Sequence, residues 1–194
     1  MMGITDPGRL RPLAPYEALY AEGPRRFAIP ATAEPAAWEA WRAAFRASLA
    51  GRLAIAPGAA PPPRLLASAP PTDHGDYRRT YLEFEGAPGV VVPAWLLVPH
   101  GLPGPAPAVI AVHGHGYGVD DTVGIDPDGA ERDAPQGFHQ SFALALCRQG
   151  MVVLAPELAA FGRRREPGDV RPDAPAANSC HQAAWWGLML GRPL

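Results

Sequence analysis

The chain has 194 residues, 47% of them hydrophobic and 19% charged, a composition that allows a buried core and argues against global disorder. Its formal net charge of -2 gives no basic surface for nucleic acid or an anionic membrane. No apolar run reaches the roughly 20 residues of a membrane span, and the N-terminus does not read as a signal peptide.

The cysteine content is low, with only Cys147 and Cys180 in the chain. Cys147 falls within an apolar helical pattern, where a cysteine behaves as a small buried hydrophobe. Two cysteines without a disulfide framework are typical of reduced thiols, so we expect a cytoplasmic protein.

Residues 1–55 are expected to form an N-terminal arm with one amphipathic helix. Pro35 suits the first helical turn and Gly51 the end of the helix. Apolar side chains recur between them at steps of three and four, which predicts one apolar face that packs on the main body. This face consists of Trp38, Trp41, Phe45 and Leu49.

Residues 56–76 are rich in proline and predict an extended, semi-rigid connector. The sequence then changes its period. Residues 76–86 alternate between apolar and charged side chains, and residues 90–99 form a second apolar run after a glycine-containing turn, which predicts an antiparallel hairpin. Pro93 within the second run predicts a bulge or an edge position.

Residues 108–112 form a wholly apolar strand, for which we expect burial on both faces in a parallel sheet. A helical pattern at residues 139–150 ends at Gly150, and residues 151–158 form another apolar strand. A strand, helix and strand of this length predict a parallel crossover. After a polar loop, residues 180–194 predict an apolar helix that continues to the last residue.

A glycine–histidine segment, His-Gly-His-Gly-Tyr at residues 113–117, follows the first of these apolar strands. Ligands of α/β sheets bind beyond the carboxyl ends of the parallel strands. Gly114 and Gly116 carry no Cβ, so the backbone can turn sharply while its amides stay open to an oxyanion. The alternative interpretation is a tight turn that leaves the sheet.

The ordered segments resemble the N-terminal half of an α/β-hydrolase, in the branch of acetyl xylan esterases and dienelactone hydrolases. The resemblance covers residues 77–194 and rests on HGHGYGVDDTVGID, FGRRRE and NSCHQAAWWGLMLGRPL. It implies an α/β fold in which an antiparallel N-terminal hairpin leads into a mainly parallel sheet with flanking helices.

The resemblance also implies roles for residues of the loop. The backbone amide of His115 would donate to the oxyanion, with Gly116 as the second candidate, and His113 would brace the loop. Tyr117 would line the acyl pocket or cover the loop. Independently of the resemblance, the arginines at residues 163–165 follow an apolar strand and would either bind an anionic substrate group, with Arg163 as the candidate, or form a charged surface. Because the acids of the family come from later strands, Glu157 would anchor the loop rather than act in a catalytic triad.

The family requires a nucleophile in the pattern Gly-x-Ser-x-Gly, and this chain has none. We therefore expect a chain truncated before the nucleophile elbow, with the acid and the base also absent. Ser179, Cys180 and His181 are adjacent, but neighbouring helical residues point about 100° apart and cannot share a proton in line. Asn178 or Ser179 is better interpreted as a helix N-cap.

We expect neither a metal nor a cofactor. The acidic segment at residues 120–133 lacks the full spacing of a calcium loop, which predicts a solvated or helix-capping loop. His139, near a helix start, is interpreted as solvated or capping.

The predicted function is ester hydrolysis on a small-molecule substrate through a serine acyl-enzyme, in the complete form of the protein. Two alternatives remain open at this point. One is a peptidase or amide hydrolase on the same fold, and the other is a non-catalytic α/β-hydrolase-like binding protein.

Overall fold

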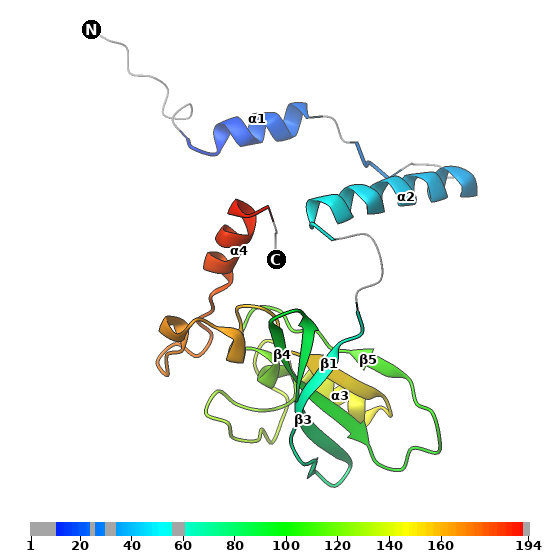
Figure 1. Cartoon of the computed structure of the whole chain (residues 1–194), viewed down its shortest axis with the longest axis vertical. Helices are drawn as coiled ribbons and strands as arrows, with labels where there is room; N and C mark the ends of the chain where they lie inside the picture. Colours follow the sequence, from blue (N-terminus) through cyan, green and yellow to red (C-terminus); the bar gives the residue numbers. More distant parts are fainter. Residues whose placement is uncertain (1–10, 24–25, 30–33, 56–60, 192–194) are drawn as a thin grey trace. The chain divides into compact units, whose positions relative to one another are not determined.

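The computed structural model describes residues 11–23, 26–29, 34–55 and 61–191. The chain divides into two compact units, Met1–Ile55 and Ala56–Leu194. Figure 1 shows helices alone in the first unit and the sheet in the second.

The first unit contains α1 (Ala14–Glu22) and α2 (Pro35–Arg52). α2 confirms the predicted helix, and Pro35 stands in its first turn. Trp41 stacks on both Trp38 and Phe45, with ring centroids 4.9 and 5.3 Å apart. α1 was not predicted, because its apolar side chains are spread around the helix and form no single apolar face. Packing of α2 on the main body stays a prediction.

The proline-rich connector turns out to contribute two strands to the sheet. β1 (Arg64–Ser68) and β2 (Thr72–Asp73) both pair antiparallel with β3 (Tyr77–Ala87). The prolines at positions 61–63 and 70–71 flank β1 and do not interrupt it. Because β1 itself contains no proline, all its residues have backbone N–H groups for pairing. The prediction of a connector without strands did not take this into account.

The predicted hairpin is confirmed as β3 and β4 (Val90–Pro99), paired from Tyr77↔Pro99 to Ala87↔Val90. Figure 1 shows these long strands in the middle of the sheet. Its order is β1-β3-β4-β6-β5, so β4 is an interior strand.

Pro93 therefore lies neither in an edge strand nor at a bulge, and that prediction was wrong. The ladder between β4 and β6 ends next to Pro93, at Ala94↔Pro156. The carbonyl of Pro93 still accepts the amide of Glu157 at 2.8 Å. Proline has no N–H that could donate a second hydrogen bond to the carbonyl of Glu157. This carbonyl instead accepts a hydrogen bond from Nη1 of Arg164 at 3.0 Å.

The strand–helix–strand unit consists of β5 (Ala108–Ile110), α3 (Phe142–Arg148) and β6 (Val152–Pro156). β5 and β6 are parallel, as predicted. Burial of β5 on both faces is not found, because side chains alternate between the two faces of a strand and one of these faces is exposed. Ala111 is buried, whereas Ile110 and Val112 on the opposite face are 68% and 52% exposed. β5 is also the edge strand of the sheet, with no neighbour on its outer side among the described residues.

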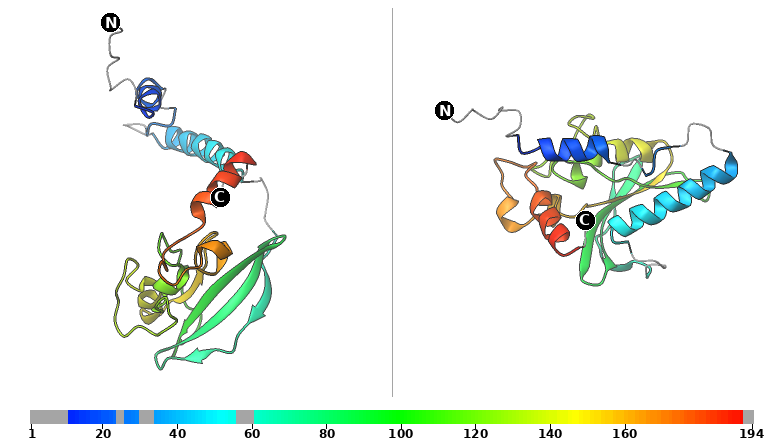
Figure 2. Two further views of the ribbon diagram at one scale, coloured as in Figure 1. Left: turned by 90° about the vertical axis from the view of Figure 1, so that its left-hand side faces the viewer. Right: turned by 90° about the horizontal axis from the view of Figure 1, so that it is seen from above.

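α3 packs against β4 and β6, and Figure 2 shows it with the loops on one side of the sheet. The core between them includes Leu97, Val123, Leu144, Cys147 and Val153. Cys147 is fully buried in this core, as predicted, and its burial raises the pKa of the thiol to about 11.

α4 (Cys180–Met189) is the predicted last helix, but it stops short of the end of the chain. Gly191 follows with φ +65°, the left-handed conformation that commonly ends a helix. Among the described residues, no helix has the length and apolar character to cross a membrane.

Candidate active site

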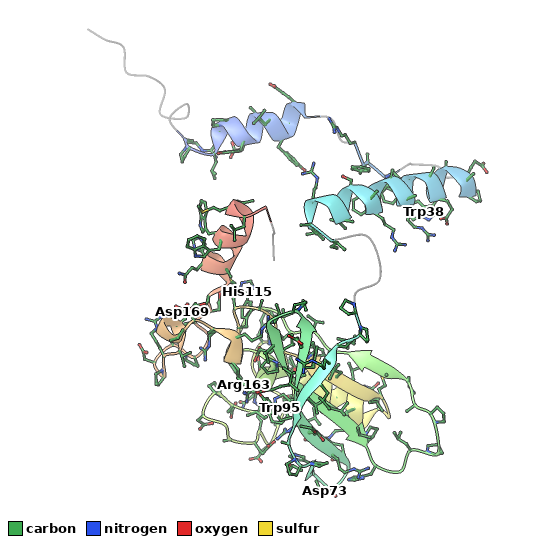
Figure 3. The ribbon with its side chains drawn as sticks, in the orientation of Figure 1. Trp38, Asp73, Trp95, His115, Arg163 and Asp169 are labelled. Carbon is green, nitrogen blue, oxygen red and sulfur yellow. The ribbon has the colours of Figure 1, made fainter. Side chains whose placement is uncertain are left out.

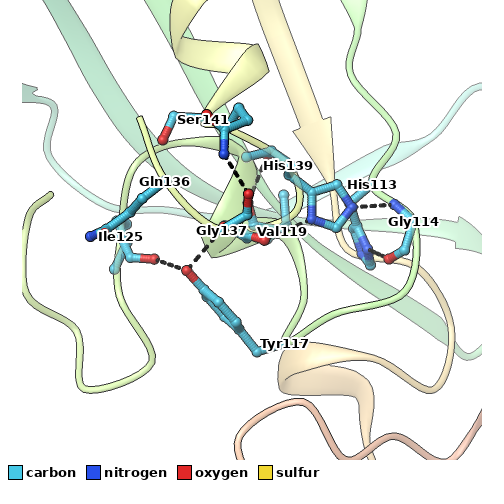
Figure 4. A network of polar contacts seen from close by, with 12 residues as sticks. His113, Gly114, Tyr117, Val119, Ile125, Gln136, Gly137, His139 and Ser141 are labelled. Atoms are coloured by element: carbon cyan, nitrogen blue, oxygen red, sulfur yellow. Dashed lines mark hydrogen bonds and ion pairs between the residues drawn. The ribbon is translucent and has the colours of Figure 1, made fainter. Parts of the chain in front are cut away.

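The glycine–histidine loop leaves the carboxyl end of β5, beside the end of β6. His113 is 2% exposed, and its Nδ1 lies 2.8 Å from the carbonyl oxygen of Gly114. Its Nε2 lies 2.9 Å from Oε1 of Glu157 and 3.0 Å from the amide of Leu158. His113 therefore braces the loop against the end of β6, in the role that the resemblance implied (Figure 4).

The surroundings of His113 favour its protonated form. Burial by itself lowers the pKa of the imidazole, but the hydrogen bonds to Glu157 and to the Gly114 carbonyl outweigh burial and raise it. In the protonated ring, Nδ1–H donates to Gly114 and Nε2–H donates to Glu157. In the neutral ring, Nε2 accepts the Leu158 amide instead.

Glu157 is the anchor of two loops and is only 1% exposed. Its carboxylate accepts the amide of Val119 at 3.0 Å and the amide of Arg163 at 3.4 Å. Gly118 and Gly162 pack directly on it: a Cβ on either would lie within 3.0 Å of both carboxylate oxygens. Glu157 is thus a structural residue, as expected.

His139 has a role that the sequence did not reveal. It is 8% exposed, and the prediction of a solvated or capping histidine was wrong. Its Nε2 accepts the amide of Gly114 at 2.8 Å, and its Nδ1 lies 2.7 Å from Oδ2 of Asp121. His139 therefore holds the amide of Gly114, the residue before the two candidate oxyanion donors, in place (Figure 4).

The acidic segment folds back on its own arginine. Asp121 is buried, and its Oδ1 lies 3.0 Å from Nη1 of Arg132, whose Nε binds Asp126 at 2.9 Å. Burial raises the pKa of Asp121, but the hydrogen bonds from His139 and Arg132 outweigh it and lower the pKa. The prediction of a solvated or capping loop was therefore wrong for Asp121. No group of three or more potential metal ligands lies among the described residues.

Tyr117 is fixed by this segment. Its hydroxyl donates to the carbonyl of Ile125 at 2.8 Å and is itself contacted by Nη2 of Arg132. Burial and the charge of Asp121 raise the pKa of the phenol. Tyr117 covers the loop and also lines a cavity of about 580 Å³.

The amides of His115 and Gly116 differ from that of Gly114. Within the part of the chain that the structure describes, neither donates to a protein acceptor. The exposed ring of His115 turns toward α4, with Nε2 at 3.5 Å from Sγ of Cys180 and its edge against Phe161. The amide of Gly114 is thus bound by a side chain, and the next two amides of the loop, those of His115 and Gly116, are open.

Ser179, Cys180 and His181 do not form a catalytic group. Oγ of Ser179 donates to Asp169 at 2.7 Å, and His181 accepts the indole N–H of Trp185 at 3.3 Å. Ser179 occupies the N-cap position of α4 without capping it through its side chain. Asn178 supplies that bond instead, because its Oδ1 accepts the amide of Cys180 at 3.2 Å.

Arg163 lies at the cavity that Tyr117 lines, so the structure brings together the two predicted substrate-binding residues. Its Nη1 lies 2.9 Å from Oδ1 of Asp120, and its guanidinium lies over the rings of Tyr81 and Trp95 (Figure 3). Burial lowers the pKa of this arginine, but the bond to Asp120 outweighs burial and raises it.

A family model described as "Abhydrolase family" matches residues 24–185. The chain belongs to the Abhydrolase family. This membership confirms the predicted resemblance to α/β-hydrolases and agrees with the mixed sheet and flanking helices of the second unit.

Several solved structures that the chain matches carry the names of esterases. A putative acetyl xylan esterase from Bacteroides fragilis has a TM-score of 0.76 at 19% identity, and the match covers 98% of this chain and 48% of that one. Acetyl xylan esterase 1 from Thermoanaerobacterium sp. has a TM-score of 0.35 at 18% identity, over 67% of this chain and 33% of that one. Glucuronoyl esterase from Solibacter usitatus has a TM-score of 0.40 at 15% identity, over 81% of this chain and 48% of that one.

The first of these similarities confirms the predicted partial α/β-hydrolase fold, and the chain spans about half the length of that structure. No curated protein matches the chain.

Proposed function

We propose that this chain provides the oxyanion-binding part of a serine-type ester hydrolase that acts on a small-molecule ester. The observation that carries the proposal is the contrast between neighbouring amides. His139 binds the amide of Gly114, whereas those of His115 and Gly116 have no acceptor within the described residues.

Such amides stabilise the negative charge that develops on a carbonyl oxygen when an ester is attacked. The stabilisation is large only when the donors are positioned before the reaction, so that no reorganisation is needed. Here the loop is fixed from two sides, by His139 beneath it and by His113 on the anchor Glu157. The imidazole of His115 has no part in this chemistry.

In this proposal the nucleophilic serine, the acid and the base come from residues outside these 194. Two observations support the division. The sequence has no serine in the Gly-x-Ser-x-Gly pattern, and the chain spans 48% of the putative acetyl xylan esterase whose fold it shares. β5 has no partner on its outer side among the described residues, and this edge is where a further strand could extend the sheet.

The test compares the 194-residue chain with the complete form of the protein. Both are assayed with 4-nitrophenyl acetate, with its anilide counterpart, and with a fluorophosphonate that labels activated serines. We expect the complete form alone to cleave the ester and take up the label, and to cleave the ester faster than the anilide. Stoichiometric labelling of a serine in the 194-residue chain would contradict the proposal.

A further inference from the structure

The cavity beside the glycine–histidine loop has an unbalanced charge. About 580 Å³ in volume, it is lined by three arginines and two aspartates. These are Arg163, Arg165, Arg171, Asp120 and Asp128. The rest of its wall is largely apolar and includes Val170 and Pro172.

One arginine and one aspartate neutralise each other. Arg163 and Asp120 form an ion pair at 2.9 Å, and Asp120 also accepts the indole N–H of Trp95 at 2.7 Å. This pair stiffens the wall of the cavity but contributes no net charge to it.

Among the described residues, Arg165 forms hydrogen bonds with backbone carbonyl groups, which are neutral. Its Nε donates to the carbonyl of Gly162 at 2.8 Å, and its Nη1 donates to the carbonyls of Pro175 and Ala177 at 3.0 and 3.2 Å. Carbonyl oxygens orient a guanidinium without cancelling its charge. Among the described residues, neither Arg165 nor Arg171 forms an ion pair with a carboxylate.

Asp128 is the remaining negative group of the lining, and its Oδ1 accepts the amide of Ala130 at 3.0 Å. Once Arg163 and Asp120 are set aside as a neutral pair, the remaining charged groups of the lining are the positive Arg165 and Arg171 and the negative Asp128. The cavity therefore has a surplus of one positive charge. A monoanion balances this surplus, and a carboxylate is the monoanion whose planar shape best matches guanidinium groups.

We propose that this cavity binds the carboxylate of a substrate that carries its negative charge apart from the ester bond. The apolar wall would contact the body of the same molecule. Tyr117 lines the cavity and follows Gly116 directly in the chain, so the cavity adjoins the loop that carries the open amides. Only the identification of the ligand as a substrate rests on the proposed function.

The experiment measures binding to the 194-residue chain by titration calorimetry at low salt, with benzoate and benzamide as probes of equal shape. We expect benzoate to bind at least tenfold more tightly than benzamide. Arg171→Gln should weaken benzoate binding about fivefold or more. Arg78→Gln removes the same charge from an exposed position on β3 outside the cavity, and should leave the affinity unchanged.

A gain of affinity provides the decisive control. Asp128→Asn keeps an oxygen for the amide of Ala130 and raises the surplus charge by one, so it should tighten benzoate binding severalfold. A damaged fold could not produce this result. Equal affinities for benzoate and benzamide, or equal effects of Arg171→Gln and Arg78→Gln, would overturn the proposal. Because binding is measured without turnover, failure of the hydrolase proposal would leave this result standing.

Discussion

The imidazole of His139 connects the carboxylate of Asp121 to the backbone amide of Gly114, at 2.7 Å on one side and 2.8 Å on the other (Figure 4). Asp121 and Gly114 precede His139 by 18 and 25 residues, so this connection joins separate parts of the long excursion between β5 and α3. It ties the position of the glycine–histidine loop to a buried charge.

Removal of this imidazole should destabilise the fold. In His139→Ala the amide of Gly114 loses its acceptor, and buried Asp121 loses one of its two basic partners. We therefore expect the free energy of unfolding to fall by about 2 kcal/mol or more. Urea denaturation measures the difference. His181→Ala changes an exposed histidine and should stay within about 0.5 kcal/mol of the original chain. Equal stability of the two variants would contradict the assigned role of His139.

The contact between Gly162 and Glu157 predicts a second large loss of stability. Gly162 has φ +48°, and a Cβ there would lie within 2.7 Å of both oxygens of buried Glu157. Gly162→Ala should therefore cost about 3 kcal/mol, because neither the backbone nor the carboxylate can move away. Gly168→Ala is the matched control, because nothing lies within 4 Å of its added Cβ. A Gly162→Ala chain as stable as Gly168→Ala would show that the carboxylate is free to move.

The contact between His113 and Glu157 predicts a raised pKa. NMR titration of the imidazole should place the pKa of His113 above its ordinary 6.5, because the carboxylate and the Gly114 carbonyl outweigh the effect of burial. Glu157→Gln removes the charge and should lower this pKa. Titration of His113 at or below 6.5 in the original chain would show that burial prevails.

The same shift predicts how stability changes with pH. A histidine whose pKa is raised on folding adds stability that is complete below pH 6.5 and is lost as the pH rises through the folded pKa. The free energy of unfolding should therefore fall as the pH rises above 6.5, and the fall should be smaller in Glu157→Gln. Asp121 has a lowered pKa, so its contribution is also stabilising but has the opposite pH dependence: it is complete above pH 3.8 and is lost as the pH falls below 3.8. Urea titrations at a series of pH values measure the free energy of unfolding in both pH ranges. If this free energy changed equally with pH above 6.5 in the original chain and in Glu157→Gln, the His113 contribution would be excluded.

The parts of the fold that the sequence predicted have local causes. The hairpin of β3 and β4 follows from alternation around a short turn, and the parallel β5–β6 pair follows from two apolar runs around a helical pattern. β1 escaped prediction because its pairing with β3 spans 21 residues between Arg64 and Glu85, and the prolines around it resemble those of a linker.

The site was predictable only in part, for the same reason. Glycines after an apolar strand identified the loop and its candidate amides. The partners of the loop are side chains from irregular segments, where no periodicity indicates which residue turns inward. His139 and Asp121 are single polar residues in such segments, and their burial depends on Arg132, which neutralises the acid from 11 residues away. Only the folded chain shows that three such residues meet.

The glycine–histidine loop itself provides the last prediction, which concerns the complete hydrolase. The proposal assigns the reaction to the backbone N–H of His115, so the side chain and the amide should be separable. His115→Ala keeps the N–H and should change kcat only slightly, whereas His115→Pro removes it. Loss of one oxyanion donor typically lowers kcat by about 10²–10³, roughly 3–4 kcal/mol of transition-state stabilisation, while KM changes much less. Ester turnover by both variants is measured beside their thermal unfolding, so that a proline-distorted loop is recognised as a fall in Tm. If His115→Ala alone abolished turnover in a folded enzyme, the imidazole and not the amide would be the active group.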